Sequence, residues 1–334
     1  MTLRITATSG VAALAVIGLA AVTACSSTSS SSASSTSSPA GGASASAPAS
    51  SAAATTNNNP LAGGGSSGTV IIGSANFPEN EVLAEVYALA LQAKGVKVST
   101  KLNIGAREVY YPQVKNGAIS IIPEYNGTLL TVEVDPKSTA KTTEQVDTEL
   151  AAKLPSTLTV LNPAAAQDSD SITVTAATAA KYHLKSIADL KPYASSMVLG
   201  GPPEFKTRSD GISGLKANYG LTFKGFDGLD TSGPLTLKAL TSDKVQAADV
   251  FTTSPQIVTD KLVALSDPKS NFAAQNVIPL VNKSALTPTI SSTLNAVDAK
   301  LTTAALVQMV NAAVNEKENY STVAADFLKT IGIG

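Results

Sequence analysis

Residues 70–98 read VIIGSANFPENEVLAEVYALALQAKGVKV, and residues 118–128 read AISIIPEYNGT. The first four of them, 70–73, are apolar and rich in β-branched side chains, which predicts a buried strand. Pro78 suits the first position of a helix, two glutamates follow near its N-terminus, and Gly95 marks its end. A strand, a polar turn and a helix N-terminus leave free backbone N–H groups at the mouth of a sheet. This is where α/β proteins bind small ligands.

The same alternation of apolar runs and helical patterns continues along the chain. We expect a third strand at Ala118–Ile122 and a polar loop at Pro123–Thr128. Apolar residues with a 3.6-residue spacing predict two amphipathic helices in the tail, at Ser291–Val314 and Tyr320–Ile331.

Two sets of α/β units are predicted, joined by extended polar stretches near residues 168–172 and 272–277. We expect lobe 1 at 69–170 plus 273–334, and lobe 2 at 171–272. The loops at the strand ends of both lobes would then face one cleft. Two-lobed proteins of this kind close around a ligand by hinge motion.

The N-terminus has the pattern of an export signal. Residues 1–24 contain a basic Arg4 and an apolar stretch at Val11–Val22, and Cys25 follows directly. The four residues Val22-Thr23-Ala24-Cys25 resemble a lipobox, which predicts that the Cys25 thiol carries a lipid. A plain secretory signal with an incidental cysteine is the alternative. The apolar stretch is shorter than the ~18 residues that a transmembrane helix needs.

The composition of residues 25–68 predicts a flexible tether between the lipid anchor and the folded part. After Cys25 they are almost entirely Ser, Ala, Thr, Gly, Asn and Pro, without a charged side chain. Such a segment buries too little surface to offset its ordering entropy, and its r.m.s. reach is on the order of 35–40 Å. The folded part is therefore expected outside the cytoplasm, close to the outer face of the cell membrane.

Composition argues against several classes of function. The chain has 24 Lys and Arg against 25 Asp and Glu, a net charge of −1, and no basic run, so nucleic acid is not an expected partner. One histidine and one cysteine exclude a multi-histidine or zinc-type metal site and an intrachain disulfide. No G-x-S-x-G elbow follows a predicted strand, and no P-loop is present. We expect a monomer that is not an enzyme and holds no cofactor or metal.

Five stretches together resemble one family, and they cover the whole predicted folded part. The chain is similar to the substrate-binding lipoproteins of osmoprotectant ABC transporters, the glycine betaine- and choline-binding proteins of the ProX or OpuBC type. The resemblance rests on IIGSANFPENEVLAEVYALAL (71–91), GAISIIPEYNGT (117–128), AQDSDSITV (166–174), GPPEFKTRSDGISGLKANYGLTF (201–223) and FTTSPQI (251–257).

The resemblance implies a two-lobed periplasmic-binding-protein-like fold of type II with two hinge crossings. It also implies binding of a quaternary ammonium solute in an aromatic cage and delivery of that solute to permease subunits. A trimethylammonium group donates no hydrogen bonds, so ring faces hold it, each contact being worth about 0.5–2 kcal/mol. A carboxylate on the same solute is met by Arg, Lys, hydroxyl or backbone N–H groups.

The residues expected to contact the ligand come from the strand-end loops and the matched motifs. Tyr125 and Phe77 match family aromatics, Arg208 is the candidate anion partner, and Thr128 supplies a hydroxyl. Asp170 stands where relatives often have a tyrosine, so the implied cage is poor in tyrosine. The full set is Ser74, Asn76, Phe77, Tyr125, Asn126, Thr128, Asp168, Asp170, Glu204, Arg208, Phe251, Thr252 and Thr253.

Structural roles also explain several of these residues. Arg208 could form an ion pair with Asp210 or Glu204, Phe77 and Phe251 could belong to the core, and the aspartates could order the hinge. The pair Tyr110–Tyr111 is predicted to cover a helix face. At the level of the whole protein, the alternative is a surface sensor or adhesin with the same fold and a different ligand. A secreted hydrolase is disfavoured because no nucleophile and base are paired in the sequence.

Overall fold

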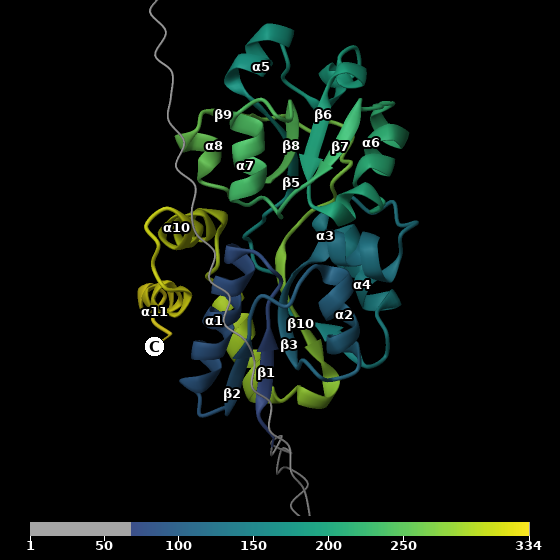
Figure 1. The fold of residues 1–334 in the computed structure, drawn as a ribbon. Helices are drawn as coiled ribbons and strands as arrows, with labels where there is room; N and C mark the ends of the chain where they lie inside the picture. The colour runs from purple at the N-terminus through teal and green to yellow at the C-terminus, as the bar shows by residue number, and fades with distance from the viewer. Residues whose placement is uncertain (1–67, 334) are drawn as a thin grey trace, which may run out of the picture. The chain divides into compact units, whose positions relative to one another are not determined.

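The computed structural model describes residues 68–333, and these contain two five-stranded sheets with helices on both faces (Figure 1). This confirms the predicted two-lobed α/β fold. The predicted signal peptide, Cys25 and the tether lie outside the described residues. Among residues 68–333, no helix is both long enough and apolar enough to cross a membrane.

The sheet of lobe 1 has the strand order β2-β1-β3-β10-β4. Its first three strands are parallel, as the alternation of strands and helices predicts, whereas β10 runs antiparallel to both β3 and β4. Its strands are β1 (Val70–Gly73), β2 (Val98–Lys101), β3 (Ile121–Tyr125), β4 (Leu158–Val160) and β10 (Val277–Asn282).

Helices cover the two faces of this sheet with separate cores. Helix α1, whose residues from Val82 to Leu91 are largely buried, packs with the three C-terminal helices on one face. Helices α2 and α4 cover the other face. The helices of this lobe are α1 (Pro78–Gln92), α2 (Arg107–Lys115), α3 (Asn126–Thr128), α4 (Thr143–Lys153), α9 (Pro288–Asp298), α10 (Thr303–Val314) and α11 (Tyr320–Thr330), and a π-helical turn spans Leu129–Val134.

The sheet of lobe 2 has the strand order β7-β6-β8-β5-β9, with β5 antiparallel to both its neighbours. Its strands are β5 (Asp170–Thr175), β6 (Val198–Gly201), β7 (Gly225–Gly228), β8 (Ala247–Phe251) and β9 (Leu262–Ala264). Its helices are α5 (Ala176–Tyr182), α6 (Ile212–Tyr219), α7 (Pro234–Thr241) and α8 (Gln256–Thr259). A 3-10 turn at Pro203–Lys206 follows β6.

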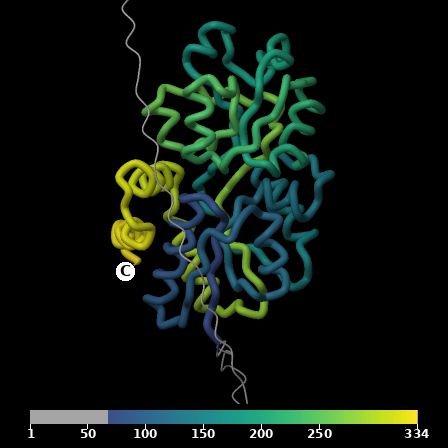
Figure 2. The backbone as a smooth tube through the Cα atoms, in the orientation of Figure 1, coloured from purple at the N-terminus to yellow at the C-terminus, as the bar shows by residue number. Residues whose placement is uncertain are grey.

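The chain crosses between the lobes twice, over residues 161–169 and 265–276 (Figure 2). The crossings run side by side, because the Asp168 N–H donates to the Gln275 carbonyl at 3.1 Å and the Val277 N–H donates to the Ala166 carbonyl at 3.0 Å. Paired crossings restrict the lobes to rotation about this two-stranded connection.

Two local predictions are wrong. The segment Pro123–Thr128 is not a loop, because β3 stays paired with β10 as far as Tyr125 and a helical turn begins at Asn126. The predicted helix Ser291–Val314 is two helices. The Thr302 hydroxyl accepts the Ala305 N–H at 3.2 Å and so starts α10 as a new helix after α9 has ended at Asp298.

A buried hydrogen bond links α1 to α9. The Tyr87 hydroxyl donates to both carboxyl oxygens of Asp298, at 3.0 and 3.1 Å, and both residues are fully buried. Burial raises the pKa of Asp298 well above its usual value, although the Tyr87 bond opposes that rise.

We therefore expect Tyr87→Phe to lower the free energy of unfolding by about 2 kcal/mol, because it leaves the Asp298 carboxyl group without its donor. Urea denaturation measures this change. Tyr193→Phe removes a hydroxyl from a half-buried ring that stacks on Tyr182, and serves as the control. Equal losses in the two variants would contradict a specific role for the bond.

Candidate functional site

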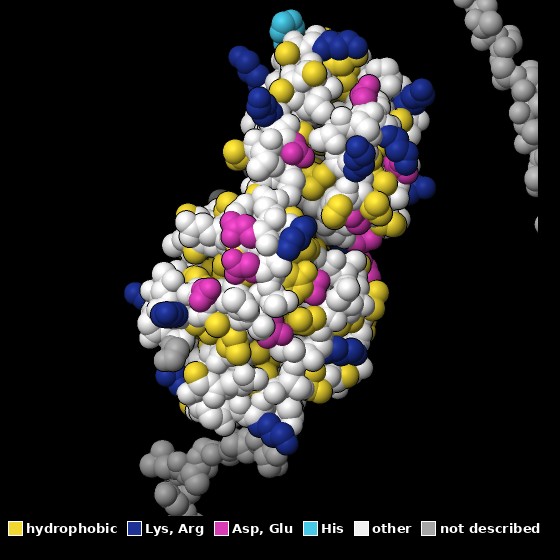
Figure 3. All heavy atoms as spheres, turned by 60° about the vertical axis from the view of Figure 1, so that its left-hand side comes forward, with side chains coloured by type: hydrophobic (Ala, Val, Ile, Leu, Met, Phe, Trp, Pro, Cys, Tyr) yellow, Lys and Arg dark blue, Asp and Glu magenta, His cyan; other side chains and the backbone are white. Residues whose placement is uncertain are grey.

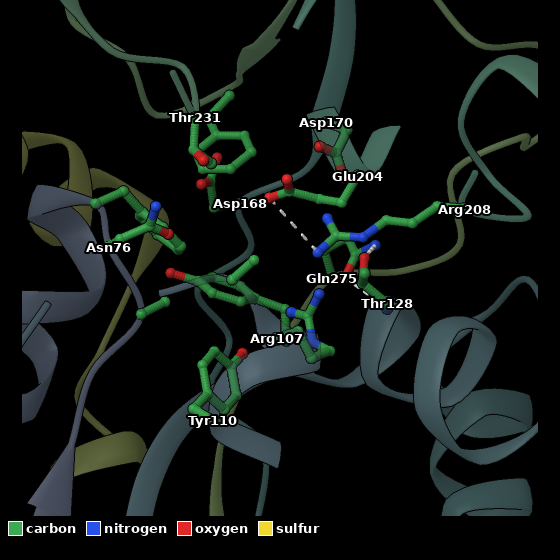
Figure 4. A pocket seen from close by; sticks show the side chains of 15 residues that line it. Asn76, Arg107, Tyr110, Thr128, Asp168, Asp170, Glu204, Arg208, Thr231 and Gln275 are labelled. Atoms are coloured by element: carbon green, nitrogen blue, oxygen red, sulfur yellow. Dashed lines mark hydrogen bonds and ion pairs between the residues drawn. The ribbon is translucent and has the colours of Figure 1, made fainter. Parts of the chain in front are cut away.

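A cavity of about 40 Å³ lies between the lobes, where the crossings, the loop after β1 and the end of β8 meet (Figure 4). Most of the residues predicted to contact a ligand line it: Asn76, Phe77, Tyr125, Thr128, Asp168, Asp170, Glu204, Arg208 and Phe251. Both lobes therefore contribute side chains to one small space. This agrees with the expectation that the strand-end loops of the two lobes face one cleft.

Four predicted residues do not line this cavity and instead hold its walls. The Ser74 hydroxyl accepts the Asn103 N–H at 2.8 Å, which fixes the loop after β1. Asn126 accepts the N–H of Asn276 at 2.8 Å and so ties β3 to the second crossing. On the side of lobe 2, the Thr252 hydroxyl and the Thr253 N–H both donate to the Asp168 carboxylate, at 3.1 and 3.0 Å.

Several further residues line the cavity without having been predicted from the sequence: Ala75, Ala106, Arg107, Tyr110, Thr231 and Gln275. Arg107 had one detectable signal, because a cation in the first turn of a helix is opposed by the helix dipole and needs another reason to be there. Tyr110, predicted to cover a helix face, is buried in the core of lobe 1 and also borders the cavity one turn after Arg107. Gln275 carried no such signal.

Three aromatic rings from both lobes form one side of the cavity. The Phe77 and Phe251 rings meet edge to face, with centroids 5.1 Å apart and planes at 71°. The Tyr125 ring also lies beside Phe77, with a centroid distance of 6.0 Å and planes at 33°. Two rings at a steep angle make a corner, and a cation in such a corner is attracted by ring faces.

The cavity floor is a buried ion pair. The Arg107 guanidinium donates to Glu124 through Nε, at 3.0 and 3.2 Å, and through Nη2, at 2.9 Å. The fully buried Glu124 carboxylate also accepts the Tyr110 hydroxyl at 2.8 Å and the Tyr125 N–H at 2.9 Å. Burial raises the pKa of Tyr110 well above its usual value, and the charge of Glu124 adds to the rise against the opposing charge of Arg107.

A second buried carboxylate bridges the lobes directly. Glu79, in the first turn of α1, accepts the Tyr125 hydroxyl at 2.7 Å and the Thr253 hydroxyl at 2.6 Å. Burial raises the pKa of Glu79 to about 7, although its hydrogen bonds with Thr253 and Tyr125 oppose the rise. Burial and then the charge of Glu79 raise the pKa of Asp168 as well. These two carboxyl groups thus favour a shared proton while they are buried together.

Arg208 forms an ion pair with a residue that was not predicted from the sequence, which had indicated Glu204 or Asp210. Its guanidinium forms a two-point contact with Glu108 of α2, with Nε–Oε1 at 3.0 Å and Nη2–Oε2 at 3.1 Å. The predicted partner Glu204 lies 4.0 Å from the same Nη2. The other predicted partner, Asp210, is instead placed 3.5 Å from the Thr131 hydroxyl. The Arg208–Glu108 contact joins lobe 2 to lobe 1 at the edge of the cavity.

Acidic side chains gather on the side of the cavity formed by lobe 2 and the first crossing. Asp168, Asp170 and Glu204 all line it, and in Figure 4 they lie on the side opposite Arg107 and Tyr110. Burial raises the pKa of Asp170, while the charge of Arg208 opposes the rise. On the neighbouring strand β8, a carboxyl oxygen of the buried Asp249 has no hydrogen-bond partner among the described residues.

A larger, open cavity of about 620 Å³ adjoins the first and shares Phe77, Thr231 and Phe251 with it. It runs between α7 and α8 of lobe 2 and the α1 and α10 helices of lobe 1. Figure 3 shows the face that carries these helices, with hydrophobic side chains beside the junction of the lobes and scattered Lys and Arg. Among the described residues, no group of three or more His, Cys, Asp and Glu is placed to hold a metal ion.

Several known proteins are similar to this chain over most of its length. YehZ, a glycine betaine-binding protein of Escherichia coli K12, is 29% identical over 277 residues, which are 79% of this chain and 90% of that protein. A glycine-betaine-binding protein of Pseudomonas aeruginosa is 26% identical over 279 residues, 78% of this chain and 87% of that protein. The crystal structure titled glycine betaine/carnitine/choline ABC transporter shares the fold, with a TM-score of 0.62 at 23% identity, covering 79% and 99% of the two chains.

The family model described as the substrate binding domain of ABC-type glycine betaine transport systems matches residues 68–330. This match spans nearly all the described residues, both lobes and both crossings. It confirms the resemblance found in the sequence motifs. The chain therefore belongs to the family of substrate-binding domains of ABC-type glycine betaine transport systems.

Proposed function

We propose that this protein captures a small osmoprotectant-like solute, namely glycine betaine, choline or a related quaternary ammonium compound, in the cavity between its lobes. One observation carries the proposal: aromatic rings from both lobes and charged side chains from both lobes line a single cavity in a protein of this family. Members of the family bind small solutes and work with ABC permease components on the extracytoplasmic side of the membrane. Delivery of the solute to such a permease follows from the proposal.

Binding by lobe closure accounts for how the site operates. Phe77 and Tyr125 belong to lobe 1 and Phe251 to lobe 2, so the complete set of rings exists only when the lobes are together. A ligand that contacts both sides binds the closed form more tightly and shifts the population towards it. The permease would then recognise the two closed lobes as one surface. No bond is made or broken in this cycle, so the protein acts as a binding protein and not as an enzyme.

The N-terminal features fit the same role. A lipid on Cys25 would hold the protein at the outer face of the membrane, and the tether at 25–68 would let the lobes reach a permease. A monomer suffices, since one chain supplies both walls of the cavity.

Isothermal titration calorimetry with glycine betaine, choline, carnitine and ectoine tests the proposal on the purified protein. We expect a saturable exchange of heat with at least one of them. Absence of binding by all four at millimolar concentration would contradict the assignment of the cavity to quaternary ammonium solutes and related osmoprotectants.

We further expect Phe251→Leu to weaken binding of a quaternary ammonium ligand by about 0.5–2 kcal/mol. Leucine keeps much of the apolar contact but removes the ring face that meets Phe77 at the corner. Phe223→Leu makes the same change in the core of lobe 2, away from the cavity, and should leave the dissociation constant unchanged. Equal affinity of the Phe251 variant and the native protein would remove this ring from the site.

A further inference from the structure

The two guanidinium groups that line the cavity are both engaged by glutamates of the protein itself. Arg107 is held by Glu124 in the floor, and Arg208 is held by Glu108 at the edge. In each pair, Nε and one terminal nitrogen face the carboxylate, which is the geometry in which arginine recognises a ligand carboxylate. The positions that would best hold a carboxylate of the solute are therefore occupied in this structure.

The remaining charge of the cavity is negative. Once Glu124 and Glu108 balance the two arginines, the acidic side chains of Asp168, Asp170 and Glu204 still line the space, and the one proton that Asp168 shares with Glu79 leaves a negative charge on that pair. Among the described residues no other Lys or Arg lines it, and the Nη2 of Arg208, which lies 4.0 Å from Glu204, is already bonded to Glu108. A carboxylate of a ligand in this space would be repelled by these negative charges, whereas a ligand with a net positive charge would be attracted by them.

We propose that Glu108 is a specificity-determining residue, which occupies the Arg208 guanidinium so that the cavity prefers a quaternary ammonium cation without a carboxylate over a carboxylated zwitterion. This inference rests on the function proposed above and narrows its ligand class. A zwitterion such as glycine betaine has to displace Glu108 from Arg208 or bind beside it. A cation such as choline needs no such exchange, and its hydroxyl group can donate to one of the lining carboxylates.

The contact biases the choice of ligand and does not forbid a carboxylate. Neither Nη1 of Arg208 nor Nη1 of Arg107 takes part in the pairs described, so each guanidinium keeps N–H groups for another partner. The Glu108 side chain is also 43% exposed, whereas that of Arg208 is only 12% exposed. Water therefore screens the carboxylate of the pair, and a graded preference is the expected outcome.

The exposure of Glu108 also makes it a suitable position for substitution. It lies in the first turn of α2 with its side chain at the surface, where it contacts Arg208 of the other lobe. Glu108→Ala and Glu108→Gln therefore remove a charge at the cavity edge without opening a core. Glu318→Ala, which removes an exposed carboxylate after α10, is the matched control.

Calorimetric titration of choline and glycine betaine into the native protein and these variants measures the ratio of the two dissociation constants. We expect native protein to bind choline more tightly by about tenfold, which corresponds to a difference of one charge-assisted hydrogen bond. In Glu108→Ala and Glu108→Gln we expect glycine betaine affinity to rise about three- to tenfold while choline affinity changes about twofold or less. The control should keep the native ratio.

The outcomes separate this inference from the proposed function. A ratio that stays at the native value in both Glu108 variants, or a native protein that prefers glycine betaine, overturns the role of Glu108 and leaves the solute-binding function in place. Weakening of both ligands by the same factor shows that Glu108 acts only on lobe closure, which also overturns it. If native protein binds none of the four solutes named above, the proposed function fails, and this inference fails with it.

Discussion

Replacing Glu124 with alanine is expected to lower the free energy of unfolding by about 3–5 kcal/mol, because breaking a buried ion pair leaves an uncompensated charge in the interior. The Arg107 side chain is only 8% exposed and Glu124 is fully buried. The same carboxylate also receives the Tyr110 hydroxyl and the Tyr125 N–H, so three donors lose their acceptor at once.

Urea denaturation of native and variant protein at neutral pH measures the change. Glu149→Ala removes a carboxylate from an exposed pair with Lys153 and should have a far smaller effect. Adding Arg107→Met to the Glu124 variant should recover part of the lost stability, because the unpaired charge is then absent. If the Glu124 variant were as stable as the Glu149 variant, the Arg107–Glu124 ion pair would not contribute to the stability of the protein as proposed here.

The sequence could predict the parts of the fold that depend on neighbouring residues. The strand at Val70–Gly73 and the start of α1 at Pro78 follow from β-branched residues and from the preference of proline for the first helical turn. The end of β3 could not be placed in this way. Its pairing with β10 extends the strand through Tyr125, and β10 lies about 150 residues further along the chain.

The residues of the candidate site also fall into those that could be predicted from nearby sequence and those that depend on distant parts of the chain. Residues at strand ends, such as Phe77 and Asp168, could be nominated because function gathers in such loops. Their partners could not, since Glu79 and Thr253 are 174 residues apart and Glu108 and Arg208 are 100 residues apart. In the sequence Glu108 is one more charge near a helix start, and only the approach of the two lobes gives it a partner.

We also expect the protein to lose stability as the pH rises from 5 to 8, with Glu79 contributing about 2–3 kcal/mol of the loss. Burial raises the pKa of Glu79 to about 7 in the folded state, above the value of about 4.3 expected in the unfolded chain. Between these values the folded protein holds a proton that the unfolded chain has released, so a higher pH favours unfolding. The contribution is fully present below the lower pKa and is lost as the pH approaches the higher one.

Other buried carboxyl groups act in the same direction over this range. Burial raises the pKa of Asp168 and of Asp249 well above the usual value of an aspartate, and that of Asp210 to about 6. In contrast, the hydrogen bond and charge of Arg208 lower the pKa of Glu108 against the effect of its partial burial. The glutamine of Glu79→Gln stays neutral at every pH. The free energy of unfolding of this variant should therefore fall less between pH 5 and 8 than that of the native protein, by the amount attributed to Glu79. Glu85→Gln makes the same substitution further along the same helix and serves as the control.

Urea denaturation at constant ionic strength between pH 5 and 8, in the absence of ligand, measures both slopes. A flat native curve, or one that rises with pH, would mean that Glu79 is ionised in the folded protein and that Tyr125 and Thr253 hold it as an anion. An unchanged slope in Glu79→Gln would assign the proton to Asp168 instead. A shallower slope would identify Glu79 as the group that makes contact between the lobes depend on pH, because its carboxyl group is the one bonded to Thr253 across the cleft.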